Sequence, residues 1–420
     1  MSRTCFSFSF SFSICLALLL AAPATAIGDE APAPPFTSAA ALERWLARNA
    51  SPLDRMPPYA RALFLDALGF GPRGLHTLPV GVLLAELTTA EAADVQRLLL
   101  DADTPFQGLT VNEAARLRAA RAEGRLAPPS DAVLGAYRDW QDASMGPSPD
   151  GSAAAAIDRL IAREVASDRD AGEDLRLLQR AAVERATAVP DGARIDRAVA
   201  LHARLQSQGL AMRNDHRDLQ QALLRNGRID QARSFTASLP DAGLPPVPIF
   251  DTAHPLADGA VGIWTIDTDD NAVPTLRLGA IDLGTRIVIV SSPGCGFSNA
   301  AAAAIPDDPE LGPVFAQYAT WLIAPTAVAE ASTLRAWNRR HPATPIRIAA
   351  DASQWPMDFD TTPQFLVFRE GALVARLGRW QRDGSDRDAL HAMLVRAGLL
   401  RSTGPSRSTG DNPGPDPRDR

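Results

Sequence analysis

The chain of 420 residues contains no lysine, so each of its 42 basic side chains is an arginine. This absence excludes a lysine nucleophile and a lysine Schiff base. We attribute it to the base composition of the gene, which also explains the abundant alanine and the 34 prolines. The net charge is -7, spread without one strong acidic or basic block. Because phosphate binding requires a basic face, we expect no nucleic-acid partner.

The amino terminus has the pattern of a signal peptide over residues 1–26. Arg3 precedes a run of apolar or small residues at positions 6–20, and Ala24-Thr25-Ala26 fits the small-x-small cleavage rule. The run is short for a membrane-spanning helix, which argues against an uncleaved anchor. We therefore expect an exported, periplasmic protein that begins at Ile27 and has no membrane attachment after cleavage.

Cysteine is scarce, because the chain holds only Cys5, Cys15 and Cys295. The first two leave with the signal peptide, so the mature protein keeps one thiol and forms no internal disulfide. In an oxidising compartment, a lone thiol is either buried and inert or reacts with a group outside the chain.

Metal-binding and cofactor-binding patterns are missing as well. The six histidines show neither H-x-H nor HExxH spacing, so we expect no zinc site. The polar cluster at residues 267–271 lacks the Gly and Glu of an EF-hand loop, since Ala272 and Leu278 occupy those positions. We interpret it as the turn of a β-hairpin, and we expect neither a metal nor a cofactor.

After a linker at residues 27–36, residues 37–240 are predicted to be helical. Apolar residues recur at helical spacing, and no segment has a convincing strand pattern. A weak repeat places RIDRA at Arg194 and RIDQA at Arg228, an offset of 34 residues, which is the tetratricopeptide period. The second copy, with Gly227 and Phe235, resembles the back half of such a repeat. The resemblance implies helical hairpins, while a true repeat array and an irregular bundle both remain open.

Beyond a second linker at residues 240–248, the pattern changes to strands alternating with helices. Strands are predicted at residues 287–290, 318–323, 346–349, 365–368 and 373–377, and helices at 328–340 and 386–396. This order predicts an α/β layer fold. Residues 401–420 have nothing apolar to bury, so we expect a disordered tail.

The C-terminal third resembles thioredoxin-like proteins. Residues 286–299 (RIVIVSSPGCGFSN) are similar to the family's active-site segment, in which a buried strand and a short turn lead to a cysteine and a helix. Residues 361–368 (TTPQFLVF) resemble its Thr-Pro before a strand, and residues 369–374 its hairpin turn. The strand at 346–349 is similar to the TlpA-like or redoxin branch. The resemblance implies a multidomain protein with an all-α helical-hairpin region and a thioredoxin-like α/β domain over residues 251–400.

The resemblance implies that Cys295 is the catalytic thiol. A cysteine at a helix N-terminus lies beside unpaired backbone N–H groups, which stabilise the thiolate. Ser298 stands where the family has its resolving cysteine, so a dithiol cycle within one chain is impossible, and its hydroxyl is expected to bond the thiolate. Ile289 replaces a buried acid that helps to deprotonate that second cysteine.

The same resemblance implies where a client would bind. Pro363 is expected to follow a cis peptide bond and, with Thr362, to align an extended client peptide beside the sulfur. Gly294, which replaces the family's usual aromatic residue, and Phe297 complete the predicted substrate-binding residues.

Two related families fit less well. The string CGFS at residues 295–298 matches monothiol glutaredoxins, which hold an iron–sulfur cluster, but those proteins rely on an upstream lysine and this chain has none. A one-cysteine peroxiredoxin is favoured by Ser292, but Val288 stands where those enzymes have proline.

Two hypotheses remain. In the first, the protein is an exported monothiol thiol-disulfide oxidoreductase, whose Cys295 reacts with the disulfides or sulfenic acids of protein clients or of a redox partner. In the second, it is a redox-inactive binding module made of a thioredoxin fold and helical repeats.

Overall fold

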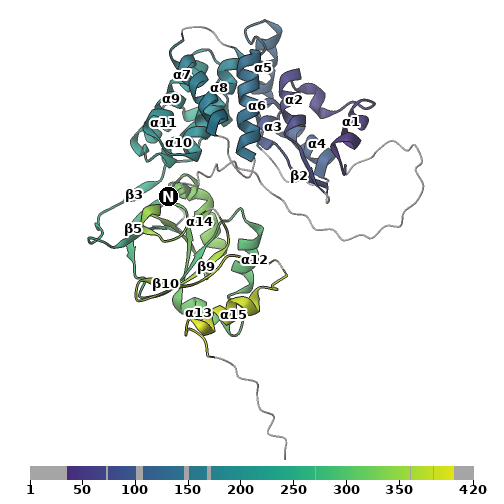
Figure 1. The fold of residues 1–420 in the computed structure, drawn as a ribbon. Helices are drawn as coiled ribbons and strands as arrows, with labels where there is room; N and C mark the ends of the chain where they lie inside the picture. Colours follow the sequence, from purple (N-terminus) through teal and green to yellow (C-terminus); the bar gives the residue numbers. More distant parts are fainter. Residues whose placement is uncertain are drawn as a thin grey trace, which may run out of the picture. The chain divides into compact units, whose positions relative to one another are not determined.

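The computed structural model describes residues 36–401, except 72–73, 101–106, 146–150, 168–171, 270, 360 and 382. In this part the chain is a multidomain α/β protein that divides between Val247 and Pro248 into an N-terminal unit and a C-terminal unit (Figure 1). The predicted signal peptide and the tail beyond residue 401 lie outside the described residues. No described helix has the length and hydropathy needed to cross a bilayer.

The N-terminal unit consists mainly of helices. They are α1 (Ala39–Leu46), η1 (Pro52–Arg55), α2 (Pro58–Asp66), α3 (Val80–Glu86), α4 (Thr89–Leu100), α5 (Val111–Ala122), α6 (Asp131–Met145), α7 (Gly151–Val165), α8 (Glu173–Ala188), α9 (Gly192–Ser207), α10 (Arg213–Arg225), α11 (Ile229–Ala237) and η2 (Pro240–Ala242). Local signals start several of them. At α5, the Thr110 hydroxyl accepts from the Glu113 amide at 3.2 Å, and the Glu113 carboxylate accepts from the Thr110 amide at 2.8 Å.

Two short strands make the prediction of an all-α region wrong. β1 (Gly69–Gly71) and β2 (Gly74–Thr77) pair as an antiparallel hairpin. A Cβ at Gly69 would lie 2.5 Å from the His76 ring, so the glycine permits the close approach of the two strands. The sequence signal was weak because three or four residues, rich in glycine, show no alternation of apolar and polar side chains.

The two copies of the repeated motif both lie at the start of a helix in the N-terminal unit. Arg194 lies in the first turn of α9, and Arg228 immediately precedes α11. The helices α9 and α11 are the second members of the successive pairs α8–α9 and α10–α11. The alanine of each copy, Ala198 and Ala232, is fully buried. The offset of 34 residues therefore corresponds to one helix pair.

A buried ion network joins four helices of the N-terminal unit. Glu86 of α3 and Glu173 of α8 are each bonded to both Arg121 of α5 and Arg176 of α8, at distances between 2.6 and 3.1 Å. The hydroxyl of Tyr59 on α2 donates to Glu173 at 2.8 Å. Two carboxylates and two guanidinium groups thus balance their charges in the interior, which limits the cost of burying them.

The C-terminal unit is built on one mixed sheet with the strand order β10-β9-β6-β7-β8-β4-β5-β3. The strands are β3 (Ile249–Asp251), β4 (Val261–Ile266), β5 (Thr275–Ile281), β6 (Thr285–Val290), β7 (Ala319–Ile323), β8 (Ile346–Ala349), β9 (Gln364–Arg369) and β10 (Ala372–Leu377). β6, β7 and β8 run parallel, whereas β9 is antiparallel to both β6 and β10. The five strands predicted after residue 280 are confirmed within a few residues.

Both faces of the sheet are covered. On one face, Ile287 and Ile289 of β6 belong to a core that the helices of this unit cover. These helices are α12 (Gly296–Ala304), α13 (Leu311–Tyr318), η3 (Pro325–Glu330), α14 (Ala331–Arg340) and α15 (Arg387–Arg396) (Figure 1). Val288 and Val290 face the opposite side, where the segment from η4 (Ala352–Gln354) to Phe359 packs. Burial on both faces explains the continuous β-branched run in β6.

The polar cluster after β4 forms a hairpin turn, as predicted. β4 and β5 are antiparallel, and the Asp267 carboxylate accepts from the Thr275 amide at 3.1 Å. Arg335 and Arg339 of α14 donate to the carbonyls of Asn271 and Thr268, at 2.6 and 3.0 Å. The turn is therefore held by arginines, and nowhere in the described ranges do three metal-ligating side chains come together.

Candidate functional site

Cys295 stands at the junction between the central strand and a helix. β6 ends at Val290, and after a short turn Cys295 becomes the N-cap of α12, with its carbonyl accepting from the Asn299 amide at 3.0 Å. The Cys295 amide donates back to the Ser292 carbonyl at 3.0 Å, which closes the turn. The side chain of Cys295 is half-buried. The sulfur thus lies at the free N–H end of a helix and retains an exposed side.

The second predicted segment meets the first at this point. The thiol of Cys295 donates to the carbonyl oxygen of Thr362 at 3.3 Å, across 67 residues of sequence. The Thr362–Pro363 peptide bond is cis, as the resemblance implied, and Pro363 is buried immediately before β9. Ser298 is fully buried in the first turn of α12, and its hydroxyl accepts from the Ser292 amide at 3.4 Å.

The pKa of the Cys295 thiol is lowered from its ordinary value. Partial burial alone would raise this pKa, but the side chain of Thr362, the amide and hydroxyl of Ser298 and the amide of Phe297 lie where they can donate to the thiolate, and their combined effect outweighs burial. The two groups of Thr362 act in opposite directions, since its carbonyl accepts only from the neutral thiol while its hydroxyl donates to the thiolate. The groups that lower the pKa are neutral dipoles, so the thiolate is stabilised without a cationic side chain.

The two residues beside Cys295 differ in their surroundings. Gly294 is exposed, and a Cβ built there would meet nothing closer than the Ser292 hydroxyl at 3.8 Å. The turn therefore does not require glycine. Phe297 is half-buried on the first turn of α12.

Gln364 was missed by the sequence analysis. It directly follows Pro363, it is fully buried at the start of β9, and its side-chain amide donates to the Thr361 carbonyl at 2.8 Å. The available signal was a single amide residue at the head of the otherwise apolar run FLVF. A buried amide without partners is costly, so such a residue in an apolar strand indicates a built hydrogen-bond arrangement.

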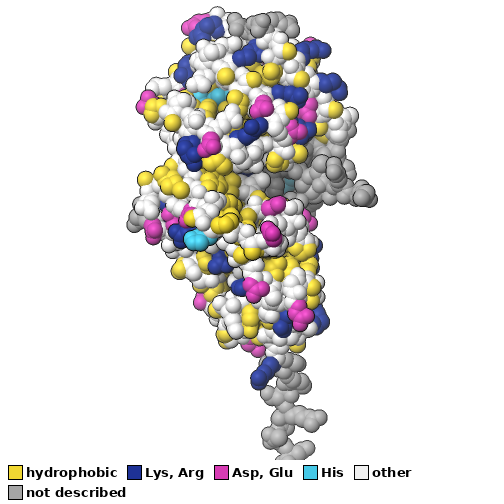
Figure 2. Space-filling model, turned by 90° about the vertical axis from the view of Figure 1, so that its left-hand side faces the viewer, with side chains coloured by type: hydrophobic (Ala, Val, Ile, Leu, Met, Phe, Trp, Pro, Cys, Tyr) yellow, Lys and Arg dark blue, Asp and Glu magenta, His cyan; other side chains and the backbone are white. Residues whose placement is uncertain are grey.

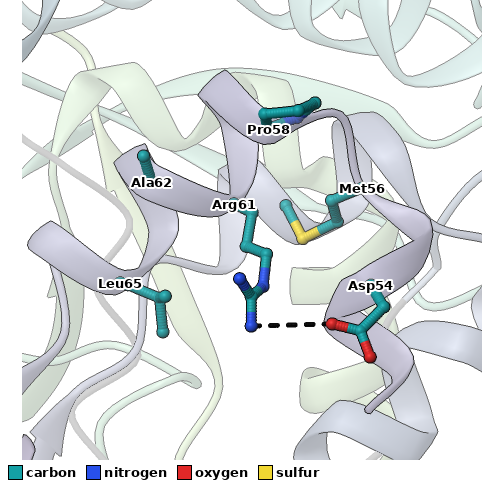
Figure 3. A pocket seen from close by; sticks show the side chains of 6 residues that line it. All are labelled: Asp54, Met56, Pro58, Arg61, Ala62 and Leu65. Atoms are coloured by element: carbon teal, nitrogen blue, oxygen red, sulfur yellow. Dashed lines mark ion pairs between the residues drawn. The ribbon is translucent and has the colours of Figure 1, made fainter. Parts of the chain in front are cut away.

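A hollow in the N-terminal unit is lined by residues of η1, of α2 and of the turn between them, and it is crossed by an ion pair of 3.5 Å between Arg61 and Asp54 (Figure 3). None of its six lining residues is a thiol, hydroxyl or imidazole nucleophile. On the described part of the face drawn in Figure 2, arginines and acidic side chains are interspersed, with no extended area of one sign.

No family model, no curated protein and no solved structure matches the chain. A functional assignment therefore depends on the geometry around Cys295 and on the resemblance of the short motifs that meet there.

Proposed function

We propose that the C-terminal unit is a thioredoxin-like domain and that Cys295 works as a single exchanging thiol. The observation that carries the proposal is the position of the sulfur, which lies at the start of α12 and 3.3 Å from the carbonyl of Thr362. The order of β6, cysteine, helix, Thr-Pro, β9 and β10 agrees with the resemblance. The hydrogen bonds that lower the thiol pKa favour the thiolate, which is the reactive form.

The proposed reaction is a thiol–disulfide exchange. The Cys295 thiolate attacks one sulfur of a client disulfide, a new S–S bond joins Cys295 to the client, and the second client sulfur leaves as a thiolate. With a client sulfenic acid, the same attack forms the S–S bond and releases the oxygen as hydroxide, which takes up a proton to become water. Ser298 and Thr362 hold the attacking sulfur, and the backbone beside Pro363 aligns the client.

An external thiol must complete the cycle. Residues 27–420 contain no second cysteine, and Ser298 is a hydroxyl at the resolving position. A thiolate from a small molecule or from a redox partner protein therefore attacks the mixed disulfide, which frees Cys295 and leaves the client joined to that thiol. We propose that this occurs in the periplasm after export and that the helix pairs of the N-terminal unit recruit the client.

A binding module without redox chemistry is the second candidate function. The successive pairs α8–α9 and α10–α11, with their offset of 34 residues, favour it because stacked helix pairs commonly form protein-binding surfaces. In this case Cys295→Ser would leave partner binding unchanged, and the thiol would have no part in recognition.

Trapping of a mixed disulfide distinguishes the two functions. Residues 27–420 are incubated with a peptide that contains one disulfide, the reaction is quenched with acid, and the adduct is located by mass spectrometry. We expect an adduct on Cys295 that dithiothreitol removes, and slower formation in Ser298→Ala because one thiolate donor is lost. Cys295→Ser is the matched control. A folded wild-type protein that forms no adduct would refute the redox function and leave the binding module.

A further inference from the structure

The side chain of Gln364 is fixed by contacts on both of its ends. Its amide nitrogen donates to the Thr361 carbonyl at 2.8 Å and lies 3.2 and 3.3 Å from the carboxylate and the carbonyl of Asp358. Its oxygen accepts from the guanidinium of Arg376 on β10. Because arginine only donates and a carbonyl only accepts, these partners allow one orientation of the amide. The side chain is fully buried and each of its polar atoms has a partner.

These contacts act directly on the residue that touches the sulfur. The Thr361 carbonyl belongs to the peptide plane that joins Thr361 to Thr362, so the bond from Gln364 fixes this plane. On the other side of Thr362, Pro363 is buried and Gln364 itself pairs with Val290 of β6. Thr362 is thus held at both ends. Its carbonyl and its hydroxyl are the groups that act on the Cys295 sulfur.

We propose that Gln364 is a positioning residue, which holds Thr362 against the Cys295 sulfur through the Thr361 carbonyl. It does not touch the sulfur or a client and acts only by restricting the backbone that does. This inference rests on the proposed thiol chemistry of Cys295. Arg376 supports it from β10, because its donation to the Gln364 oxygen turns the amide nitrogen toward the Thr361 carbonyl.

The test compares the pH dependence of Cys295 alkylation in residues 27–420 with that of variants. Gln364→Met keeps the length of the side chain and removes both the donors and the acceptor. The hydroxyl and the carbonyl of Thr362 then both lose their fixed positions. Because a hydrogen bond to the charged thiolate is stronger than one from the neutral thiol, the loss of the hydroxyl donor dominates and the alkylation midpoint moves to higher pH. At a pH below the midpoint, losing a hydrogen bond to the charged thiolate lowers the thiolate fraction about tenfold. Because the more basic thiolate is also more nucleophilic, the alkylation rate falls by only about threefold.

Two further variants separate positioning from general destabilisation. Asn338→Leu is the matched control, because Asn338 is also a buried amide with two backbone bonds, to the amide and carbonyl of Ile346 at 2.7 and 3.0 Å. It should lower the thermal midpoint of unfolding without moving the alkylation midpoint. Arg376→Met should shift the alkylation midpoint in the same direction as Gln364→Met, by a smaller amount. If Gln364→Met does not fold, Arg376→Met serves as the test variant.

The outcomes are distinct. If the wild type has a lowered alkylation midpoint and Gln364→Met has the same midpoint, the role of Gln364 is overturned and the thiol chemistry stays intact. If Gln364→Met does not fold, an unchanged midpoint in Arg376→Met has the same meaning. An equal shift in Asn338→Leu also overturns it, because the effect would then follow stability. An ordinary midpoint in the wild type, together with no mixed disulfide, refutes the proposed function and this inference with it.

Discussion

Acidification from about pH 7 to about pH 5 should destabilise the N-terminal unit, because His202 of α9 is buried as a neutral ring. Only 1% of its surface is exposed. Its Nε2 lies 2.9 Å from Nδ1 of His216 on α10, and its Nδ1 lies 3.4 Å from the amide nitrogen of Gln179 on α8. Burial, followed by the neighbouring His216, lowers the pKa of His202 to about 3. The pKa of His216 is lowered too, mainly by burial.

The size of the effect follows from proton linkage. His202 in the unfolded chain has a pKa of about 6.5, so the unfolded state binds more protons than the folded state between that value and about 3. The contribution to stability is complete above about pH 6.5 and is lost progressively as the pH falls toward the folded-state pKa. At about pH 5 the loss from His202 alone is about 2 kcal/mol, a large part of a typical stability of 5–15 kcal/mol.

Hydrogen exchange measured by mass spectrometry can follow this loss in the full chain. Peptides from α9 and α10 should exchange faster at about pH 5 than at about pH 7, after correction for the intrinsic rates. His202→Gln keeps a polar side chain and removes the titration, so it should abolish about 2 kcal/mol of the pH dependence whatever its effect on total stability. Equal pH dependence in wild type and His202→Gln would refute the account of this buried ring.

Three further results are expected. Arg176→Met should destabilise the N-terminal unit by about 3–5 kcal/mol in denaturant unfolding, because it leaves Glu86 and Glu173 underpaired in the interior; a loss below about 1 kcal/mol would contradict this. Thr362→Val should raise the pKa of the Cys295 thiol by removing a hydroxyl donor, while Thr361→Val, at an exposed neighbour, should not. Raising the salt concentration to about 1 M, where the Debye length is about 3 Å, should hardly change this pKa, because dipoles and not charged side chains lower it; a strong salt dependence would indicate a charged partner.

The sequence predicted those elements whose signal is local. The β-branched run of β6 and the apolar runs of β7, β8 and β9 are long enough to be recognised as buried strands. The strands β1 and β2 were missed because their pairing depends on the close contact of Gly69 with His76, which no local pattern encodes. The placement of β4 between β8 and β5 likewise depends on pairing between distant segments.

The candidate site divides in the same way. Cys295, Ser298 and the Thr362–Pro363 pair stand in short motifs, and the structure places them around one sulfur. The role of Gln364 could not be predicted, because its partners Asp358 and Arg376 come from separate segments and form no recognisable sequence motif with it. Its position in a buried strand was predictable, but the reason for an amide there was not.

The alkylation rate of Cys295 as a function of pH tests the central claim most directly. Residues 27–420 contain one thiol, so iodoacetamide labelling reports on that residue alone. We predict a midpoint below the ordinary thiol pKa of about 8.5, with reaction in the folded protein. A midpoint at or above this value, or labelling that begins only when the protein unfolds, would contradict the assignment of Cys295 as an activated thiol.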